Sequence, residues 1–217
     1  MTTLTEQLQK YKNNFNETVS SEILEIISRN VSLLQKQKVL KSSLKVGDVV
    51  EINRVNDGRG NAVVLDKLLS GSPLIITFVR GSWCPYCMLE LQAWNKLIQL
   101  TNHNHSVNFV AISGETAGLL RLAKRDNNLN FRITEDKGYF LAQSFGLIYK
   151  VPDEMKKLLL KWGIDLKKRA CTDDFLLPIP ATYILDKNHV IRYAFLEEDY
   201  TQRAEPQDVY NEYLKLM

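Results

Sequence analysis

Residues 74–91 read LIITFVRGSWCPYCMLEL, an apolar run followed by two cysteines three positions apart. Its first six residues, Leu74 to Val79, are apolar and rich in β-branched side chains with little alternation, which is typical of a central strand covered on both faces. Two cysteines, Cys84 and Cys87, follow, and an amphipathic segment then continues to about residue 101. The sequence therefore predicts a buried strand that leads directly into a helix with two thiols at its start.

The rest of the chain continues this alternation of strands and helices. The apolar patterns predict a strand at 107–113, a helix near 116–127, a short strand at 131–133, a short helix near 138–145, a β-hairpin over 181–195 and a last helix from about Pro206 to Leu216. This order predicts an α/β, thioredoxin-like fold, in which a central mixed β-sheet is flanked by helices. Residues 150–177 do not fit the alternation, and we interpret them as an insertion with a basic helix from Glu154 to Trp162.

The chain before residue 44 has a different, polar texture. Apolar residues recur there every three or four positions, as Ile23, Ile26, Ile27, Val31 and Leu34 show. We expect an N-terminal helical extension over 1–43, packed on a thioredoxin-like domain over 44–217. At the start of that domain, Val49–Ile52 and Ala62–Leu65 flank a segment dense in turn formers, which predicts another β-hairpin.

Composition and charge exclude several classes of protein. The 217 residues carry a net charge of +3, which is too small an excess to indicate a nucleic-acid or polybasic membrane partner. The N-terminus shows no secretory signal, and the most apolar stretch, Pro73 to Val79, is too short to cross a bilayer. We therefore expect a cytoplasmic protein. Three cysteines in a reducing compartment do not suit a disulfide scaffold, and two of them three positions apart indicate chemistry or metal binding.

The position of the two thiols favours redox chemistry. Cys84 is expected at the N-cap of the helix, where free N–H groups and the helix dipole stabilise a thiolate. Pro85 suits the first helical position, since its missing N–H has no helical partner there. Cys87 lies one turn further on and is placed to attack a mixed disulfide formed at Cys84.

Two other interpretations of the pair stay open. One is a metal or iron–sulfur site that Cys84 and Cys87 share across a dimer. A Cys-x-x-Cys pair often supplies two of four zinc ligands, but no second pair exists in this sequence, and His103, His105 and His189 are predicted in turns. A redox-sensing module without turnover is the other alternative. Elsewhere, Pro180 begins a predicted strand, which can mark a cis peptide bond in a tight turn, although trans is the commoner state.

The segment Arg80–Leu91 resembles the active site of peroxiredoxin-like proteins of the alkyl hydroperoxide reductase/thiol-specific antioxidant (AhpC/TSA) family. The similarity extends over residues 45–217 and includes Ala111–Ser113, Thr134–Gly146 and Pro180–Asp186. The resemblance implies the thioredoxin-like fold, and it favours a cis peptide bond before Pro180.

The family's motif, Pro-x-x-x-Thr-x-x-Cys, is altered in this chain. Cys87 aligns with the peroxide-attacking cysteine, Cys84 replaces the threonine and Arg80 replaces the proline. Arg203 resembles the arginine that lies near that cysteine. Two mechanisms follow from the resemblance: in disulfide exchange, Cys84 attacks and Cys87 resolves, whereas in peroxide reduction Cys87 attacks and Cys84 condenses with its sulfenic acid.

The resemblance implies a hydroperoxide or disulfide substrate, a thioredoxin- or glutathione-type electron donor and no organic cofactor or metal; a homodimer stays open. Among the neighbouring residues, we expect Trp83 to shield the site and Tyr86 to be an exposed residue that tunes it. Glu90 is expected to be a solvated or capping charge, and Cys171 a free thiol.

Overall fold

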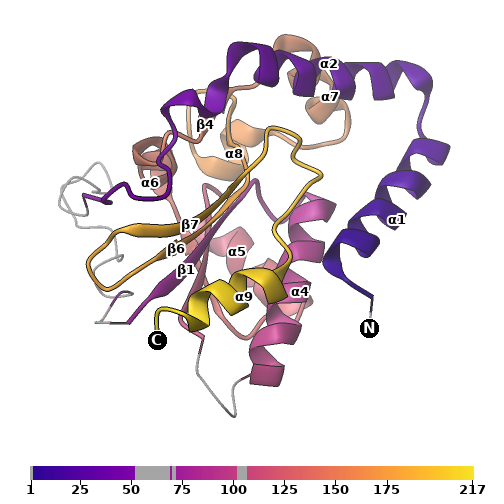
Figure 1. The fold of residues 1–217 in the computed structure, drawn as a ribbon. Coiled ribbons are helices and arrows are strands. Elements are labelled where there is room, and N and C mark those ends of the chain that lie inside the picture. Colours follow the sequence, from indigo (N-terminus) through magenta and orange to yellow (C-terminus); the bar gives the residue numbers. More distant parts are fainter. Residues whose placement is uncertain (1, 52–68, 70–71, 102–106) are drawn as a thin grey trace.

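A five-stranded mixed sheet forms the centre of the computed structural model, which describes residues 2–51, 69, 72–101 and 107–217 (Figure 1). The strands lie in the order β3-β2-β1-β6-β7. Their bounds are β1 Leu74–Val79, β2 Phe109–Ser113, β3 Arg132–Glu135, β6 Ala181–Leu185 and β7 Ile191–Leu196. β1, β2 and β3 are parallel, whereas β6 is antiparallel to both β1 and β7. All six residues of β1 are buried, which confirms the prediction of a central strand.

Helices cover both faces of this sheet, because side chains on a strand alternate between the two faces. On one face, Ile75 of β1 packs with residues of α4 (Pro85–Thr101) and α9 (Pro206–Leu214). On the other face, Phe78 packs with Phe145, which follows α6 (Phe140–Ser144). α5 (Ala117–Asp126) lies next to β3. The thioredoxin-like arrangement of a mixed sheet flanked by helices is thereby confirmed.

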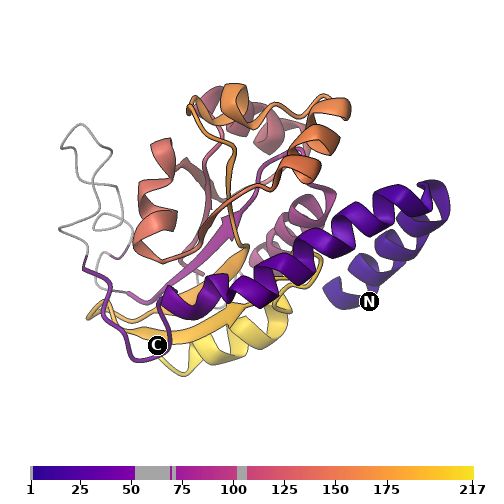
Figure 2. The same ribbon diagram turned by 90° about the horizontal axis from the view of Figure 1, so that it is seen from above.

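The N-terminal segment forms two helices that pack on the rest of the chain (Figures 1 and 2). α1 (Leu4–Thr18) begins with a capping box between Thr3 and Glu6 and lies against α4. α2 (Ser21–Gln37) lies against α7, and its apolar stripe is the side that packs, with Leu34 buried. A short 3-10 helix, η1 (Val39–Ser42), then connects the extension to the domain.

The segment interpreted as an insertion carries α7 (Asp153–Lys161), close to the predicted basic helix, and α8 (Leu166–Ala170). These helices lie between β4 (Ile148–Lys150) and β5 (Leu176–Pro178), which pair as a separate two-stranded antiparallel sheet. Figure 1 shows α2 and α7 together above the carboxyl end of β1, where the two cysteines follow. The extension and the insertion therefore meet over the dithiol.

Two expectations about local structure have different outcomes. The peptide bond before Pro180 is trans, so the expected cis bond is wrong. The chain continues here from β5 into β6 without the tight turn in which cis prolines typically occur. The hairpin predicted from residue 49 to 65 lies mostly outside the described residues; Val49 forms an isolated antiparallel bridge with Val190.

Gly146 lies against the backbone of Ser42, at the end of the N-terminal extension, and has a φ of +68°. An added Cβ would lie 2.4 Å from the Ser42 carbonyl oxygen, whereas at Gly163, with a φ of +76°, it would meet nothing within 4 Å. We expect Gly163→Ala to lower the free energy of unfolding by ~1 kcal/mol through backbone strain alone. Gly146→Ala should lower it by roughly 2 kcal/mol more, because the contact adds overpacking. Urea denaturation measures both, and equal losses would contradict the close contact with Ser42.

Candidate active site

The dithiol lies where α4 begins. The Cys84 N–H bonds the Gly81 carbonyl at 3.2 Å, and the Cys84 carbonyl accepts from the Met88 N–H at 3.1 Å, the bond expected of an N-cap residue. Pro85 is the first residue of α4, as predicted. Cys84 is 1% exposed, Cys87 is 0% exposed, and the two residues lie 3.3 Å apart. The structure therefore brings both predicted thiols together at a helix start.

Cys84 is the more acidic of the two thiols. Burial raises its pKa, but a hydrogen bond from the Cys87 thiol and the charges of Arg80 and Arg203 outweigh burial and lower the pKa to about 6. The pKa of Cys87 moves in the opposite direction, well above its ordinary value, because of burial, the hydrogen bond that it donates and the nearby Cys84 charge. Near neutral pH, the favoured state is a Cys84 thiolate beside a protonated Cys87.

Arg80 is the cation on the Cys84 side. Its guanidinium lies 4.0 Å from the ring centre of Tyr200 and 4.8 Å from that of Trp83, and the residue is 4% exposed. No carboxylate in the described part of the chain forms an ion pair with Arg80, and its Nε lacks a hydrogen-bond partner there. The Cys84 thiolate is the negative charge that Arg80 faces.

Arg203 is the cation on the Cys87 side, close to the sulfur as the resemblance implied. Its Nη2 lies 3.5 Å from Cys87 Sγ, and its Nε donates to Glu90 Oε2 at 2.7 Å. Glu90 is 1% exposed and also accepts from Thr77 Oγ1 at 2.8 Å. The prediction of a solvated or capping Glu90 is wrong, because this position lies on the side of α4 that faces the sheet.

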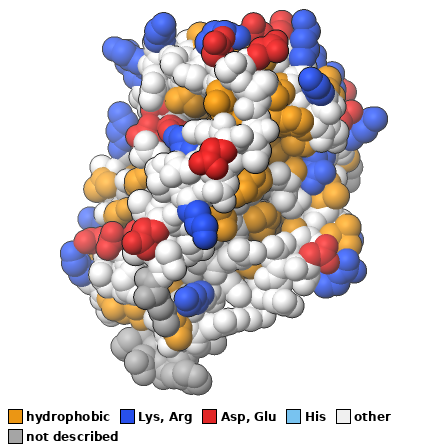
Figure 3. Space-filling model, turned by 90° about the vertical axis from the view of Figure 1, so that its right-hand side faces the viewer, with side chains coloured by type: hydrophobic (Ala, Val, Ile, Leu, Met, Phe, Trp, Pro, Cys, Tyr) orange, Lys and Arg blue, Asp and Glu red, His pale blue; other side chains and the backbone are white. Residues whose placement is uncertain are grey.

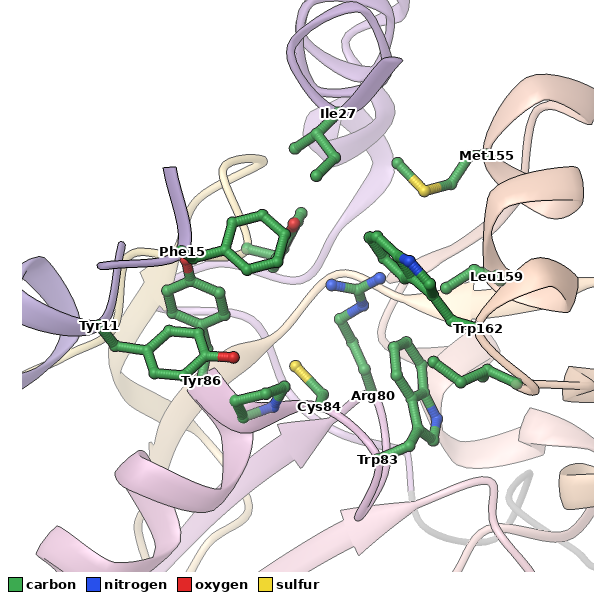
Figure 4. Close-up of a pocket in the computed structure, with 13 residues that line it drawn as sticks. Tyr11, Phe15, Ile27, Arg80, Trp83, Cys84, Tyr86, Met155, Leu159 and Trp162 are labelled. Carbon is green, nitrogen blue, oxygen red and sulfur yellow. The ribbon is translucent and has the colours of Figure 1, made fainter. Parts of the chain in front are cut away.

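An apolar cavity of about 230 Å³ opens onto Cys84 (Figure 4). Cys84 lines it and Cys87 does not. The walls come from α1, α2, α7 and the segments beside Cys84, and they include Tyr11, Phe15, Ile27, Met155, Trp162 and Trp83. Arg80 points into the same space and is the one cationic side chain of the lining.

Tyr86 is part of this wall and is buried, so the expectation of an exposed tuning residue is wrong. Its ring packs edge-on against Tyr11 at 5.1 Å and against Tyr200 at 5.6 Å between ring centres. Tyr11 comes from α1 and Tyr200 from the segment before α9, so distant parts of the chain cover a position that would be exposed on α4 alone.

A second polar cluster holds the loop before Cys84. The Ser82 N–H donates to Glu115 Oε2 at 2.6 Å, and Arg169 bonds both Glu115, at 2.5 Å, and Ser82 Oγ, at 3.0 Å. Glu115 follows β2 and Arg169 belongs to α8, so the loop is tied to two elements distant in sequence. Glu115 and Arg169 were not predicted as site residues, and neither were Tyr11 and Tyr200, because no motif or spacing near them in the sequence indicates a contact with the dithiol segment.

The remaining candidates lie apart from this site. Cys171 is exposed at the end of α8, and neither it nor Pro180 lines the cavity. Among the described residues, no group of three or more His, Cys, Asp and Glu side chains could hold a metal ion. His103 and His105 lie outside the described residues. No helix in the described part of the chain is long and apolar enough to cross a bilayer.

Comparison with known proteins identifies the family. The family model described as AhpC/TSA matches residues 46–194. Peroxidoxin BcpB from Mycobacterium tuberculosis superposes with a TM-score of 0.57 at 16% identity, over 80% of this chain and 99% of that one. A PrxQ variant from Xylella fastidiosa superposes with a TM-score of 0.57 at 14% identity, over 81% and 97% of the two chains. No curated protein matches in sequence.

At such low identities, the structural likeness establishes the fold, while the family model covers most of the chain, including the dithiol. The chain belongs to the AhpC/TSA family and is a thiol-dependent oxidoreductase of the peroxiredoxin type.

Proposed function

We propose that this chain reduces a hydroperoxide or a disulfide through attack by the Cys84 thiolate, with Cys87 as the resolving thiol. The observation that carries this proposal is the different placement of the two sulfurs. Cys84 lines the cavity and has a pKa lowered to about 6. Cys87 does not line the cavity, and its thiol stays protonated and donates a hydrogen bond to the Cys84 sulfur. The thiolate, and not the thiol, is the nucleophile, so the accessible anion is the attacking group.

With a hydroperoxide, the Cys84 thiolate attacks the terminal oxygen and the O–O bond breaks. The sulfur becomes a sulfenic acid, and the leaving oxygen takes a proton and departs as an alcohol or water. Cys87 then attacks the sulfur of the Cys84 sulfenic acid, a disulfide forms and water leaves. Arg80 points into the cavity beside this sulfur and would stabilise the charge that develops on the leaving oxygen.

With a disulfide substrate, the same two thiols act in the same order. The Cys84 thiolate forms a mixed disulfide and releases one substrate thiolate, and Cys87 then attacks the Cys84 sulfur to release the other. Cys87 must lose its proton for this step. Arg203, 3.5 Å from its sulfur, would stabilise the resulting anion, while Glu90 balances the Arg203 charge.

The surrounding residues would act as positioning groups in this proposal. Trp83 and Tyr86 form part of the cavity wall and would exclude water, and Pro85 would fix the start of α4. Pro180 would hold the start of β6 beside β1. We further propose residues 1–43 as an extension that closes the site of a domain over 44–217, and a cytoplasmic location.

Cysteine substitutions separate the two orders of attack. After one equivalent of hydrogen peroxide, Cys87→Ser should accumulate a Cys84 sulfenic acid, which dimedone traps, because the attacking sulfur remains and the resolving one is gone. Cys84→Ser should lose peroxide reduction by at least about 100-fold, since the activated nucleophile is removed. Cys171→Ser serves as the control and should behave as the unmodified protein. Intact-mass measurement follows each product. Peroxide reduction that survives Cys84→Ser but not Cys87→Ser would assign the attack to Cys87.

The acidity of Cys84 should appear in its reactivity. Since its pKa is lowered to about 6, the thiolate forms as pH rises through that value. Between pH 7 and pH 5 the alkylation rate should therefore fall about tenfold. The measurement is iodoacetamide labelling of Cys84 in a Cys171→Ser background, which removes the exposed thiol. An unchanged rate across this range would contradict the lowered pKa.

Arg80→Gln tests the cause of this acidity. Removing the cation that faces Cys84 should move the reactivity profile to higher pH, so that labelling at pH 6 slows severalfold. Arg125→Gln is the matched control, because Arg125 is a largely exposed arginine on α5 and should leave the profile in place. If the labelling rates of both variants depend on pH in the same way, Arg80 does not stabilise the thiolate.

A further inference from the structure

The cavity over Cys84 also restricts which molecule can return electrons to the oxidised site. Cys84 is 1% exposed, and the cavity of about 230 Å³ is the space that it lines. A thiol that reduces a disulfide must bring its own sulfur into contact with the sulfur it attacks. A folded protein donor must therefore present a cysteine to a sulfur that lies beneath α1, α2 and α7.

The reduced site is already arranged for disulfide formation. The Cys87 thiol hydrogen-bonds to the Cys84 sulfur and the two residues lie 3.3 Å apart, so we expect the disulfide to form with a small movement and without unwinding of α4. Tyr86, between the two cysteines, remains packed against Tyr11 of α1 and Tyr200. We therefore expect the Cys84 sulfur to remain at the bottom of this cavity in the disulfide.

The lining of the cavity favours an apolar ligand. Aromatic and aliphatic side chains from α1, α2 and α7 surround the space, among them Phe15, Ile27, Leu159 and Trp162. Figure 3, which views the molecule from the side of α1, shows hydrophobic side chains gathered on this face, with acidic and basic groups beside them and at the edges. A donor such as glutathione would have to bring an ammonium and two carboxylates toward this wall, where Arg80 is the one opposite charge.

We propose that the direct electron donor is a low-molecular-weight thiol or dithiol with an apolar body, which enters this cavity, and not a thioredoxin-type protein. This inference rests on the proposed function of the dithiol. Membership of the family implies thioredoxin-type reductants, and the inference departs from this because the Cys84 sulfur is covered in this chain.

The reaction balances as two thiol–disulfide exchanges. The donor thiolate attacks the Cys84 sulfur, the Cys84–Cys87 bond breaks, and Cys87 leaves and takes up a proton. A second donor thiolate then attacks the donor sulfur of the mixed disulfide, which releases Cys84 as a thiolate and the donor as its disulfide. Two donor thiols are oxidised, two electrons reduce the protein disulfide, one proton stays on Cys87 and one passes to solvent.

The test compares two dithiols of equal chain length, 1,4-butanedithiol and dithiothreitol, which differ by two hydroxyl groups. The full-length protein is first oxidised with one equivalent of hydrogen peroxide, and formation of the disulfide is verified by mass. Reduction is then followed with each dithiol, with glutathione and with a thioredoxin kept reduced by its reductase. Each rate is divided by the rate of the same donor with a small disulfide free in solution, which removes differences in thiol acidity.

We expect the normalised rate of butanedithiol to exceed that of dithiothreitol by at least about tenfold, because the apolar wall cannot solvate the hydroxyl groups. Phe15→Ala should reduce this preference at least about threefold, since it removes part of the wall. Phe140→Ala, which removes a partly exposed phenylalanine outside the cavity lining, is the matched control and should retain the preference.

Two outcomes overturn the inference: equal normalised rates for the two dithiols, or a thioredoxin whose normalised rate matches or exceeds that of butanedithiol. A protein that forms no disulfide with hydrogen peroxide or with a model disulfide would instead overturn the proposed function. Verification of the disulfide before the reductants are added keeps these two failures distinct.

Discussion

The balance of buried charge around the start of α4 is the constraint on which the site depends. Two arginines are buried there, and one of them, Arg203, is neutralised by Glu90 at 2.7 Å. The other, Arg80, faces Cys84 and has no carboxylate partner in the described part of the chain. An unpaired buried cation is destabilised by several kcal/mol or more. The fold therefore favours the anionic state of Cys84, which is the state that the proposed attack requires.

The same arrangement separates the roles of two chemically identical side chains. Cys84, at the first position before the helix, has the cavity on one side and Arg80 nearby. Cys87, one turn further on, is directed toward Arg203 and Glu90 and is cut off from solvent. Within the AhpC/TSA family pattern, Cys84 occupies the position of a hydrogen-bonding threonine. Here the Cys87 thiol supplies a hydrogen bond to the Cys84 sulfur, so in the proposed mechanism the donor and the nucleophile have exchanged places.

The helical extension and the insertion give this domain an enclosed site. α1 and α2 precede the domain in sequence, and α7 is part of the segment between β4 and β5, yet all three contribute to one cavity wall. A dithiol at the end of a central strand would otherwise lie at the surface of such a sheet. Enclosure excludes water, strengthens the electrostatic effects described above and limits access to molecules that fit the cavity.

Local sequence patterns were enough to predict the strand from Leu74, the helix from Pro85 and the placement of two thiols at their junction. These features depend on local physics: β-branched residues favour a buried strand, proline suits the first helical turn, and the period of apolar residues distinguishes helix from strand. The burial of Glu90 and Tyr86 and the trans bond before Pro180 could not be predicted from these patterns. Glu90 meets Arg203 across 113 positions of sequence, and Tyr86 meets Tyr11 from a separate helix. Burial is set by whatever packs against a residue, and those partners lie beyond the reach of any local pattern.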